Sequence, residues 1–132
     1  MKIFLDTADV DLISKYYGTG LIDGVTTNPT LIKKSGKDPE DVYRELALMG
    51  VDDISMEIVT DDANEFLTEG RRLKEKFGEI TTIKVPCTPQ GLRGCKFLSD
   101  EDIRVNVTLI FSAAQAVLAS KAGAAYVSPF VG

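Results

Sequence analysis

The sequence predicts an α/β fold built on parallel strands. Short runs rich in β-branched residues alternate with longer runs of helical periodicity, which is the pattern of repeated βα units. An apolar content of 44% and a charged content of 27% are typical of a globular protein. A chain of 132 residues is long enough for one modest domain with a hydrophobic core. We therefore expect a single domain over residues 1–132, without an internal linker.

Six strands and five main helices are predicted. The strands are expected at Lys2–Asp6, Gly24–Thr26, Asp53–Val59, Ile80–Val85, Ile103–Thr108 and Ala124–Ser128. The helices are expected at Ala8–Tyr17, Pro39–Met49, Asp62–Phe77, Pro89–Leu98 and Ser112–Lys121, with a short extra turn at Thr30–Lys33. Asp9 and Asp61 are predicted N-caps, because a carboxylate accepts hydrogen bonds from the first helical amides. Helix ends are predicted at Gly18, Gly50, Gly78 and Gly123.

Residue parity separates the two faces of each predicted strand. Ile83 and Val85, for example, share an apolar face, and Lys84 lies on the opposite one. A doubly wound open sheet is covered by helices on both faces and should be apolar on both. One polar face instead indicates a (β/α)8 barrel, with helices outside and chemistry at the carboxyl ends of the strands. The residues so placed are Asp6, Glu57, Lys84, Thr108 and Ser128.

Composition argues against several classes of partner and site. The net charge is −5 and no basic cluster is present, so nucleic acid and anionic membranes are poor partners. No apolar run reaches the length of a membrane span, and the N-terminus lacks the pattern of a signal peptide. Cys87 and Cys95 are expected to be reduced thiols in a cytoplasmic protein. With no histidine in the chain, a metal site is not expected.

The missing histidine also bears on catalysis. Any proton transfer must use carboxylates, lysine, tyrosine, hydroxyls or water. Lys84 is the most informative residue for this question, because it lies in the apolar run Ile80–Pro86. An ammonium in such surroundings is costly to keep charged, and a lysine held partly neutral can attack a carbonyl to form a Schiff base. Without further evidence, Lys84 is better explained as an ordinary lysine whose amine reaches solvent.

Five segments spread over the whole chain are informative together: Phe4-Leu-Asp-Thr-Ala8, Gly24-Val-Thr-Thr-Asn-Pro-Thr30, Ile83-Lys-Val-Pro86, Asn106-Val-Thr-Leu-Ile-Phe-Ser112 and Ser128-Pro-Phe-Val-Gly132. They resemble motifs of the transaldolase family and occur in the family's order. The resemblance implies the N-terminal six βα units of a small, single-domain (β/α)8 TIM barrel. It also implies a class I aldolase mechanism, with a Schiff-base lysine and neither metal nor other cofactor.

The resemblance implies a reaction and a role for each site residue. The family transfers a dihydroxyacetone unit from a ketose phosphate to an aldose phosphate, a step of the pentose phosphate pathway. Lys84 would be the nucleophile, and Glu57 the acid/base group acting through a water that Thr108 also holds. Asp6 would take the proton of the substrate hydroxyl during carbon–carbon cleavage. Substrate hydroxyls or the intermediate would be held by Asn28, Asn106 and Ser128.

A neighbouring activity resembles this one closely. Fructose-6-phosphate aldolase releases dihydroxyacetone instead of transferring it, and carries glutamine and tyrosine where this chain has Glu57 and Phe130. Those two residues favour transaldolase. The resemblance further implies sugar phosphates as substrates and a homo-oligomer, a pentamer or a decamer.

Simpler roles exist for the same residues. Asp6 and Asn28 could brace turns, Glu57 could be an ionic partner of Lys84, and threonine at position 108 suits a strand. A receiver-type phospho-switch with Mg²⁺ is a rival class, but the third strand ends in Glu57 where a phosphorylatable aspartate is needed. A non-catalytic assembly fragment is a third reading.

The last residues of the sequence bear on whether the predicted barrel is complete. Six strands do not close an eight-stranded barrel, and the sequence stops at Gly132 after the sixth. In the family, an arginine directly after this Val-Gly recognises phosphate. We therefore expect an incomplete barrel with little transaldolase activity by itself and an active longer parent.

Overall fold

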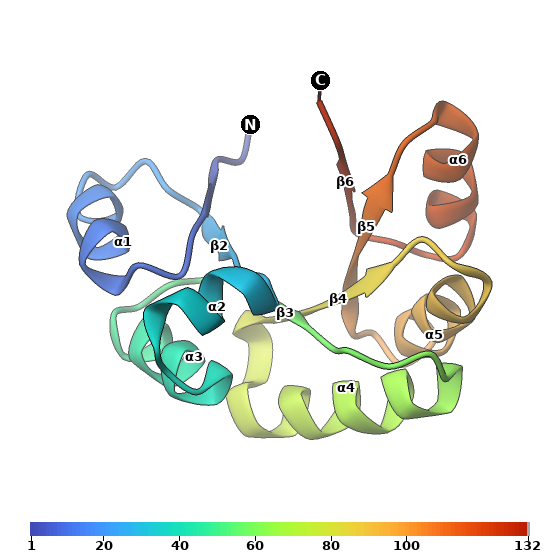
Figure 1. The fold of residues 1–132 in the computed structure, drawn as a ribbon, viewed down its shortest axis with the longest axis horizontal. Coiled ribbons are helices and arrows are strands. Elements are labelled where there is room, and N and C mark those ends of the chain that lie inside the picture. The colour runs from blue at the N-terminus through green and yellow to red at the C-terminus, as the bar shows by residue number, and fades with distance from the viewer. Residues whose placement is uncertain (132) are drawn as a thin grey trace. The chain divides into compact units, whose positions relative to one another are not determined.

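The computed structural model describes residues 1–131 and confirms the α/β class, with parallel βα units along the chain. The strands are β1 (Phe4–Asp6), β2 (Gly24–Thr26), β3 (Ile54–Glu57), β4 (Thr81–Pro86), β5 (Arg104–Ile110) and β6 (Tyr126–Pro129). The helices are α1 (Val10–Tyr17), α2 (Pro29–Ser35), α3 (Pro39–Leu48), α4 (Ala63–Phe77), the short 3₁₀ helix η1 (Gly78–Ile80), α5 (Pro89–Ser99) and α6 (Ala113–Lys121). Figure 1 shows this alternation of strands and helices.

The chain divides into two compact units. The first contains Met1–Glu57 and Phe77–Thr81, and the second contains Ile58–Lys76 and the residues from Thr82 onward. Among residues 1–131, every helix is too short or too polar to cross a bilayer.

In the first unit, β1, β2 and β3 are parallel and lie in chain order. Asp6 pairs with Thr26, and Thr26 pairs with Ser55, so the carboxyl ends of these strands lie at one edge. Gly24 is required by close packing, because a Cβ there would lie 2.6 Å from the Asp53 carbonyl oxygen. The core of this unit is fully buried and apolar, and it includes Ile13, Val25, Val42, Leu46 and Ile54.

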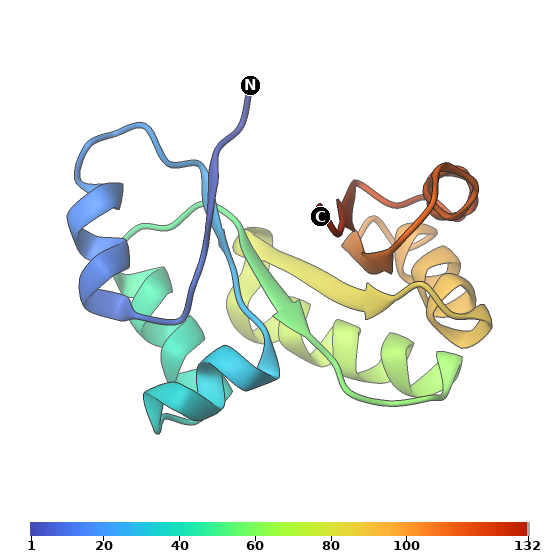
Figure 2. The ribbon, with the colours of Figure 1, turned by 45° about the horizontal axis from the view of Figure 1, so that its top comes forward.

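In the second unit, β4, β5 and β6 are also parallel and in chain order. Both ribbon views place α4 along β4 (Figures 1 and 2). Two glycines allow α4 and α5 to approach closely: a Cβ on Gly70 would lie 2.4 Å from Leu98 Cδ2, and one on Gly94 would lie 2.8 Å from Phe66 Cβ. The buried core here includes Phe66, Ile83, Leu98, Val105 and Val107.

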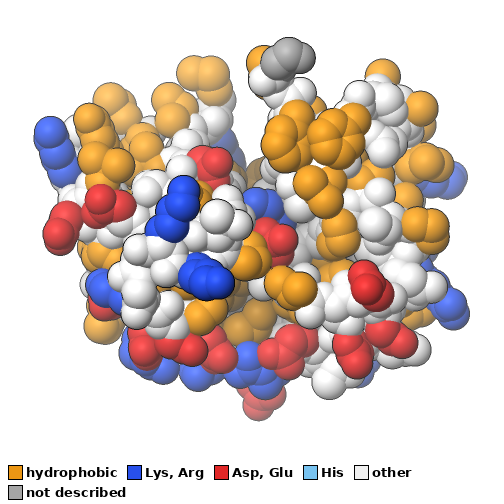
Figure 3. Space-filling model, in the orientation of Figure 1, with side chains coloured by type: hydrophobic (Ala, Val, Ile, Leu, Met, Phe, Trp, Pro, Cys, Tyr) orange, Lys and Arg blue, Asp and Glu red, His pale blue; other side chains and the backbone are white. Residues whose placement is uncertain are grey.

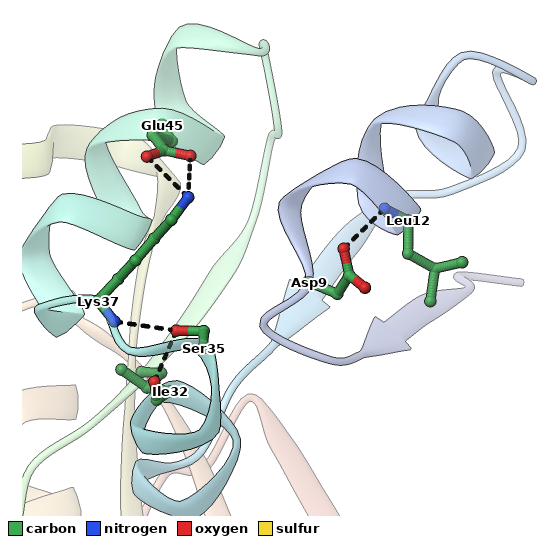
Figure 4. Close-up of polar contacts among 6 residues, drawn as sticks. All are labelled: Asp9, Leu12, Ile32, Ser35, Lys37 and Glu45. Atoms are coloured by element: carbon green, nitrogen blue, oxygen red, sulfur yellow. Dashed lines mark hydrogen bonds and ion pairs between the residues drawn. The ribbon is translucent and has the colours of Figure 1, made fainter.

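Most predicted element boundaries hold within two residues, and the differences have local causes. Asp61 was expected to cap α4, but its neighbour Asp62 does so, with Oδ1 accepting from the amides of Asn64 (2.7 Å) and Glu65 (3.1 Å). The prediction of Asp9 as a cap is confirmed, because its carboxylate accepts from the Leu12 amide at 3.1 Å (Figure 4). The predicted turn at Thr30–Lys33 is a full helix, α2.

Strand boundaries also differ: β3 ends at Glu57, two residues before the predicted end, and β6 begins at Tyr126, two residues after the predicted start. β1 and β5 differ from prediction as well. β1 begins at Phe4, because Ile3 bonds to the loop before β2: its amide donates to Asp23 Oδ2 (2.7 Å), and its carbonyl accepts from the Asp23 amide (2.8 Å). Ile3 is 42% exposed, so the expected helix cover does not reach it. β5 continues to Ile110, two residues beyond the predicted end.

Candidate functional site

Three predicted site residues lie in the first unit, at the carboxyl ends of its strands. Asp6 is the last residue of β1, Glu57 is the last of β3, and Asn28 follows β2. In parallel βα folds this edge carries the chemistry, because loops after the strands converge there. The remaining four lie in the second unit: Lys84 on β4, Asn106 and Thr108 on β5, and Ser128 on β6.

Asp6 is held by a residue that the sequence did not single out. The Thr26 hydroxyl donates to Asp6 Oδ1 at 3.0 Å, and the two residues are partners in the β1–β2 register. Residue parity could have identified Thr26 from the sequence, since it places Thr26 on the same polar face as Asp6. The bond orients one carboxylate oxygen of an exposed aspartate, which is what a proton-handling group at the rim requires.

Asn28 has a structural role that the sequence already allowed. Its Oδ1 accepts from the Leu31 amide at 2.9 Å and caps α2, with the Asn28 backbone extended. The cap uses one lone pair of the amide oxygen, so the side-chain nitrogen and the second lone pair remain for a contact of Asn28 with substrate.

Glu57 interacts with a buried tyrosine, Tyr43, that was not predicted as a site residue. Tyr43 on α3 is 3% exposed and packs edge-on against Phe77. Burial first of all, and then the negative charge of Glu57, raise the pKa of Tyr43 to about 12, even though hydrogen bonds to the Thr27 side chain and the Glu57 backbone act to lower it. The phenol therefore stays protonated near neutral pH and does not serve as a base there.

In the second unit, the predicted residues share one face of the sheet. Lys84 pairs with Asn106, and Thr108 pairs with Ser128. Lys84 is 8% exposed and Asn106 is 2% exposed, whereas Ile83, Val85, Val105 and Val107 fill the fully buried opposite face. The parity prediction is confirmed for this unit, and it places a buried lysine in a polar row.

Hydrogen bonds organise that polar face in layers. The Ser128 hydroxyl donates to Asn106 Oδ1 at 2.8 Å, so the two predicted substrate-binding residues orient each other. One layer nearer the amino ends of the strands, Arg104 Nε donates to Thr82 Oγ1 at 3.1 Å. Arg104 and Thr82 were not predicted as site residues, although their parity matches that of Lys84. They form the layer below the lysine.

Neither cysteine is given a role for its thiol at this polar face. Cys95 is fully buried on α5, and burial raises the pKa of its thiol to about 11. Cys87 follows β4, and its amide donates to the Thr108 carbonyl at 2.9 Å. Both thiols are free.

A pocket of about 440 Å³ in the first unit lies beside the loop between β1 and α1. Its lining includes Asp9, Ser35, Lys37 and Glu45 but none of the predicted site residues. Figure 4 shows that the Lys37 amine contacts both Glu45 carboxylate oxygens, at 3.0 and 3.1 Å. Because the ion pair is exposed, we interpret the pocket as a surface depression between helices and not as the reaction site.

Comparison with known proteins supplies a family for these motifs. The family model described as Transaldolase/Fructose-6-phosphate aldolase matches residues 3–132. A probable transaldolase of Nitrosopumilus maritimus is 50% identical over the whole chain, which covers 59% of that relative. Probable transaldolases of Ruegeria pomeroyi and Anaeromyxobacter dehalogenans are 52% and 53% identical, and the chain covers 60% of each. The chain thus spans about three fifths of these relatives and matches their N-terminal part.

Proposed function

The chain belongs to the transaldolase/fructose-6-phosphate aldolase family, and from this premise we propose that it carries the Schiff-base machinery of a transaldolase. The reaction transfers a dihydroxyacetone unit from a ketose phosphate to an aldose phosphate. The observation that supports this most is Lys84, which is 92% buried on the polar face of the second unit and in register with a buried asparagine. A buried lysine in a polar row is the arrangement that a Schiff-base nucleophile needs.

The proposed chemistry begins with attack of Lys84 Nζ on the ketose carbonyl carbon. The carbonyl oxygen leaves as water, and a protonated imine forms between lysine and sugar. The imine accepts the electron pair of the neighbouring carbon–carbon bond, so that bond breaks without a metal. The aldose half leaves as an aldehyde once its hydroxyl proton is taken. The three-carbon enamine left on Lys84 then adds to the acceptor aldehyde, and hydrolysis of the new imine frees the lysine.

Asp6, Glu57 and Thr108 are proposed to manage the protons. Asp6 would take the hydroxyl proton during cleavage and return it during addition, with Thr26 holding its carboxylate. Glu57 would act as acid/base group through a water shared with Thr108. Two carboxylates can do different tasks only in different environments. The structure supplies such a difference, since Asp6 is exposed and Glu57 is half-buried beside Tyr43.

The polar residues around the lysine are proposed to hold the sugar chain. Asn106 and Ser128 already bond to each other, so their remaining hydrogen-bonding capacity is fixed in direction. Asn28 would contribute its side-chain nitrogen. We further propose that the two units belong to one partial barrel domain, that the whole protein is a cytoplasmic homo-oligomer, and that it acts in the pentose phosphate pathway.

An activity assay separates transfer from release. The chain would be joined to the C-terminal part of the Ruegeria pomeroyi relative that lies beyond the match, giving an extended form. With fructose 6-phosphate and an aldose phosphate acceptor, we expect the extended form to make a new ketose phosphate, the chain by itself to make little, and a Lys84→Arg variant of the extended form to make none. An exposed lysine changed in the same way, Lys121→Arg, should leave the rate unchanged.

The outcomes are distinct. Acceptor-independent release of dihydroxyacetone as the main product would assign the chain to the aldolase branch of the family. Full turnover by the Lys84→Arg variant would remove the Schiff-base proposal altogether.

A further inference from the structure

An irregularity in β5 lies directly beside Thr108. Leu109 has φ +59°, the left-handed region that a non-glycine residue seldom adopts. At the same place the register with β6 shifts: Thr108 pairs with Ser128, but the next pair is Ile110 with Pro129. Two residues of β5 therefore correspond to one step of β6, which makes Leu109 the extra residue of a β-bulge.

The bulge changes which face the following side chains join. In a regular strand, Ile110 would share the polar face with Asn106 and Thr108, because side chains alternate. With Leu109 turned out of the ladder and 42% exposed, Ile110 instead continues the apolar face of Val107 and is 2% exposed. Its carbonyl accepts from the Phe130 amide at 3.0 Å, so the ladder resumes after the bulge.

Alternation of side chains continued past Ile110 assigns the next residue, Phe111, to the polar face. Phe111 and Phe130 lie one row beyond the Thr108–Ser128 pair, and their rings stack with centroids 5.0 Å apart and planes 10° from parallel. The Phe111 amide is fixed by Gln115 Oε1 at 2.7 Å, at the start of α6. Both rings are largely exposed, and Figure 3 shows hydrophobic side chains gathered at this end of β5 and β6.

We propose that the Leu109 bulge is a positioning element of the Lys84 site, holding Thr108 beside Ser128 and bringing Phe111 onto the polar face. There Phe111 and Phe130 form an apolar wall one row beyond the Thr108 and Ser128 hydroxyls. The wall limits water on that side of the reacting sugar chain and holds the Phe130 ring in one orientation. The inference rests on the proposed Schiff-base function, because the wall has no task without a substrate on Lys84.

A matched pair of variants isolates the backbone conformation from the side chain. Leu109→Asn and Leu109→Val both remove the leucine side chain, but asparagine tolerates the left-handed region and a β-branched valine does not. Two quantities would be compared with those of the wild type. One is the nuclear Overhauser contact between the Phe111 and Phe130 rings in the chain, and the other is the rate at which borohydride traps a fructose 6-phosphate adduct on Lys84 in the extended form.

We expect the asparagine variant to keep the ring contact and to trap the adduct within about twofold of the wild-type rate. The valine variant should lose the contact and trap about tenfold or more slowly, since small displacements of positioning groups have effects of this size. Equal trapping rates in the two variants would overturn the positioning role. If the valine variant kept the contact between the Phe111 and Phe130 rings, the left-handed conformation of Leu109 would not be what brings the two rings together.

A third variant covers the case in which the valine protein does not fold. Phe111→Leu changes a side chain that is 67% exposed, so folding should survive, while the stack on Phe130 is lost. Adduct trapping should slow by about threefold or more. An unchanged trapping rate would show that the Phe111–Phe130 wall does not assist the reaction at Lys84. Failure of the proposed function has a separate signature, because the wild-type extended form would then carry no adduct on Lys84 whatever the ring contacts show.

Discussion

Gly91 on α5 packs closely against the end of β4, the strand that carries Lys84. Replacing Gly91 with alanine therefore tests how tightly this part of the second unit is packed. Gly91 lies in the first turn of α5, where its amide donates to Oγ1 of the N-cap residue Thr88 at 3.0 Å. A Cβ at this position would lie 1.9 Å from the Pro86 carbonyl oxygen, about 1.5 Å closer than the 3.4 Å at which ordinary contact begins. The obstacle is backbone at the end of β4, which cannot turn aside as a flexible side chain would.

The size of the effect follows from opposing contributions. Overpacking against backbone costs about 1–3 kcal/mol, and weakening the Thr88 cap costs about 1 kcal/mol. Alanine is better than glycine inside a helix by about 1 kcal/mol, which offsets part of this. We expect Gly91→Ala to lower the free energy of unfolding by about 2 kcal/mol.

Urea denaturation followed by circular dichroism measures this loss. A decrease of about 2 kcal/mol corresponds to a fall of about 1 M in the urea midpoint. Gly18→Ala is the control, because Gly18 has φ −60° and its Cβ would meet nothing closer than 3.4 Å. That variant should equal the wild type or exceed it by up to about 1 kcal/mol. A Gly91→Ala midpoint equal to that of the control would refute the packing argument.

Two further predictions concern protonation. Burial raises the pKa of Tyr43 from 10.0 to about 12 and that of Cys95 from 9.0 to about 11, so both groups hold their protons more tightly when folded. Their contribution to stability is complete below about pH 9 and should fall as the pH rises from there to about 12. A flat urea midpoint over that range would contradict this, and Tyr43→Phe should remove the upper part of the fall. Thr26→Val deletes the hydroxyl that donates to Asp6. In the extended form it should lower kcat about three- to tenfold with stability nearly unchanged, and an unaltered kcat would show that the Asp6 carboxylate needs no such support.

Residue types and their periodicity were enough to predict the polar face of the second unit. Lys84, Asn106 and Thr108 alternate with apolar residues, so parity alone assigns their face. The same rule fails after Thr108, because it assumes an unbroken ladder. A leucine gives no local sign that it will adopt a left-handed conformation. The bulge appears only when β5 is paired with β6 and Ile110 is drawn into the core.

The first unit shows two other limits of the sequence. Tyr43 has the spacing of a core residue on α3, next to Val42 and one turn before Leu46, and nothing in that pattern connects its hydroxyl with Glu57. At the start of α4, Asp61 and Asp62 are adjacent and chemically identical, so residue type does not distinguish them, and the structure has Asp62 as the cap. Asn28 was predicted with two possible roles, and the structure establishes the cap while the substrate contact stays a prediction.

The most direct test of the central proposal is to locate the covalent adduct. The extended form would be incubated with fructose 6-phosphate and borohydride, digested, and mapped by mass spectrometry. We expect one reduced sugar adduct, on the peptide that contains Lys84, with none in a Lys84→Ala variant and full labelling in Lys121→Ala. An adduct on another lysine, labelling that survives Lys84→Ala, or no adduct at all would contradict the assignment of Lys84 as the nucleophile.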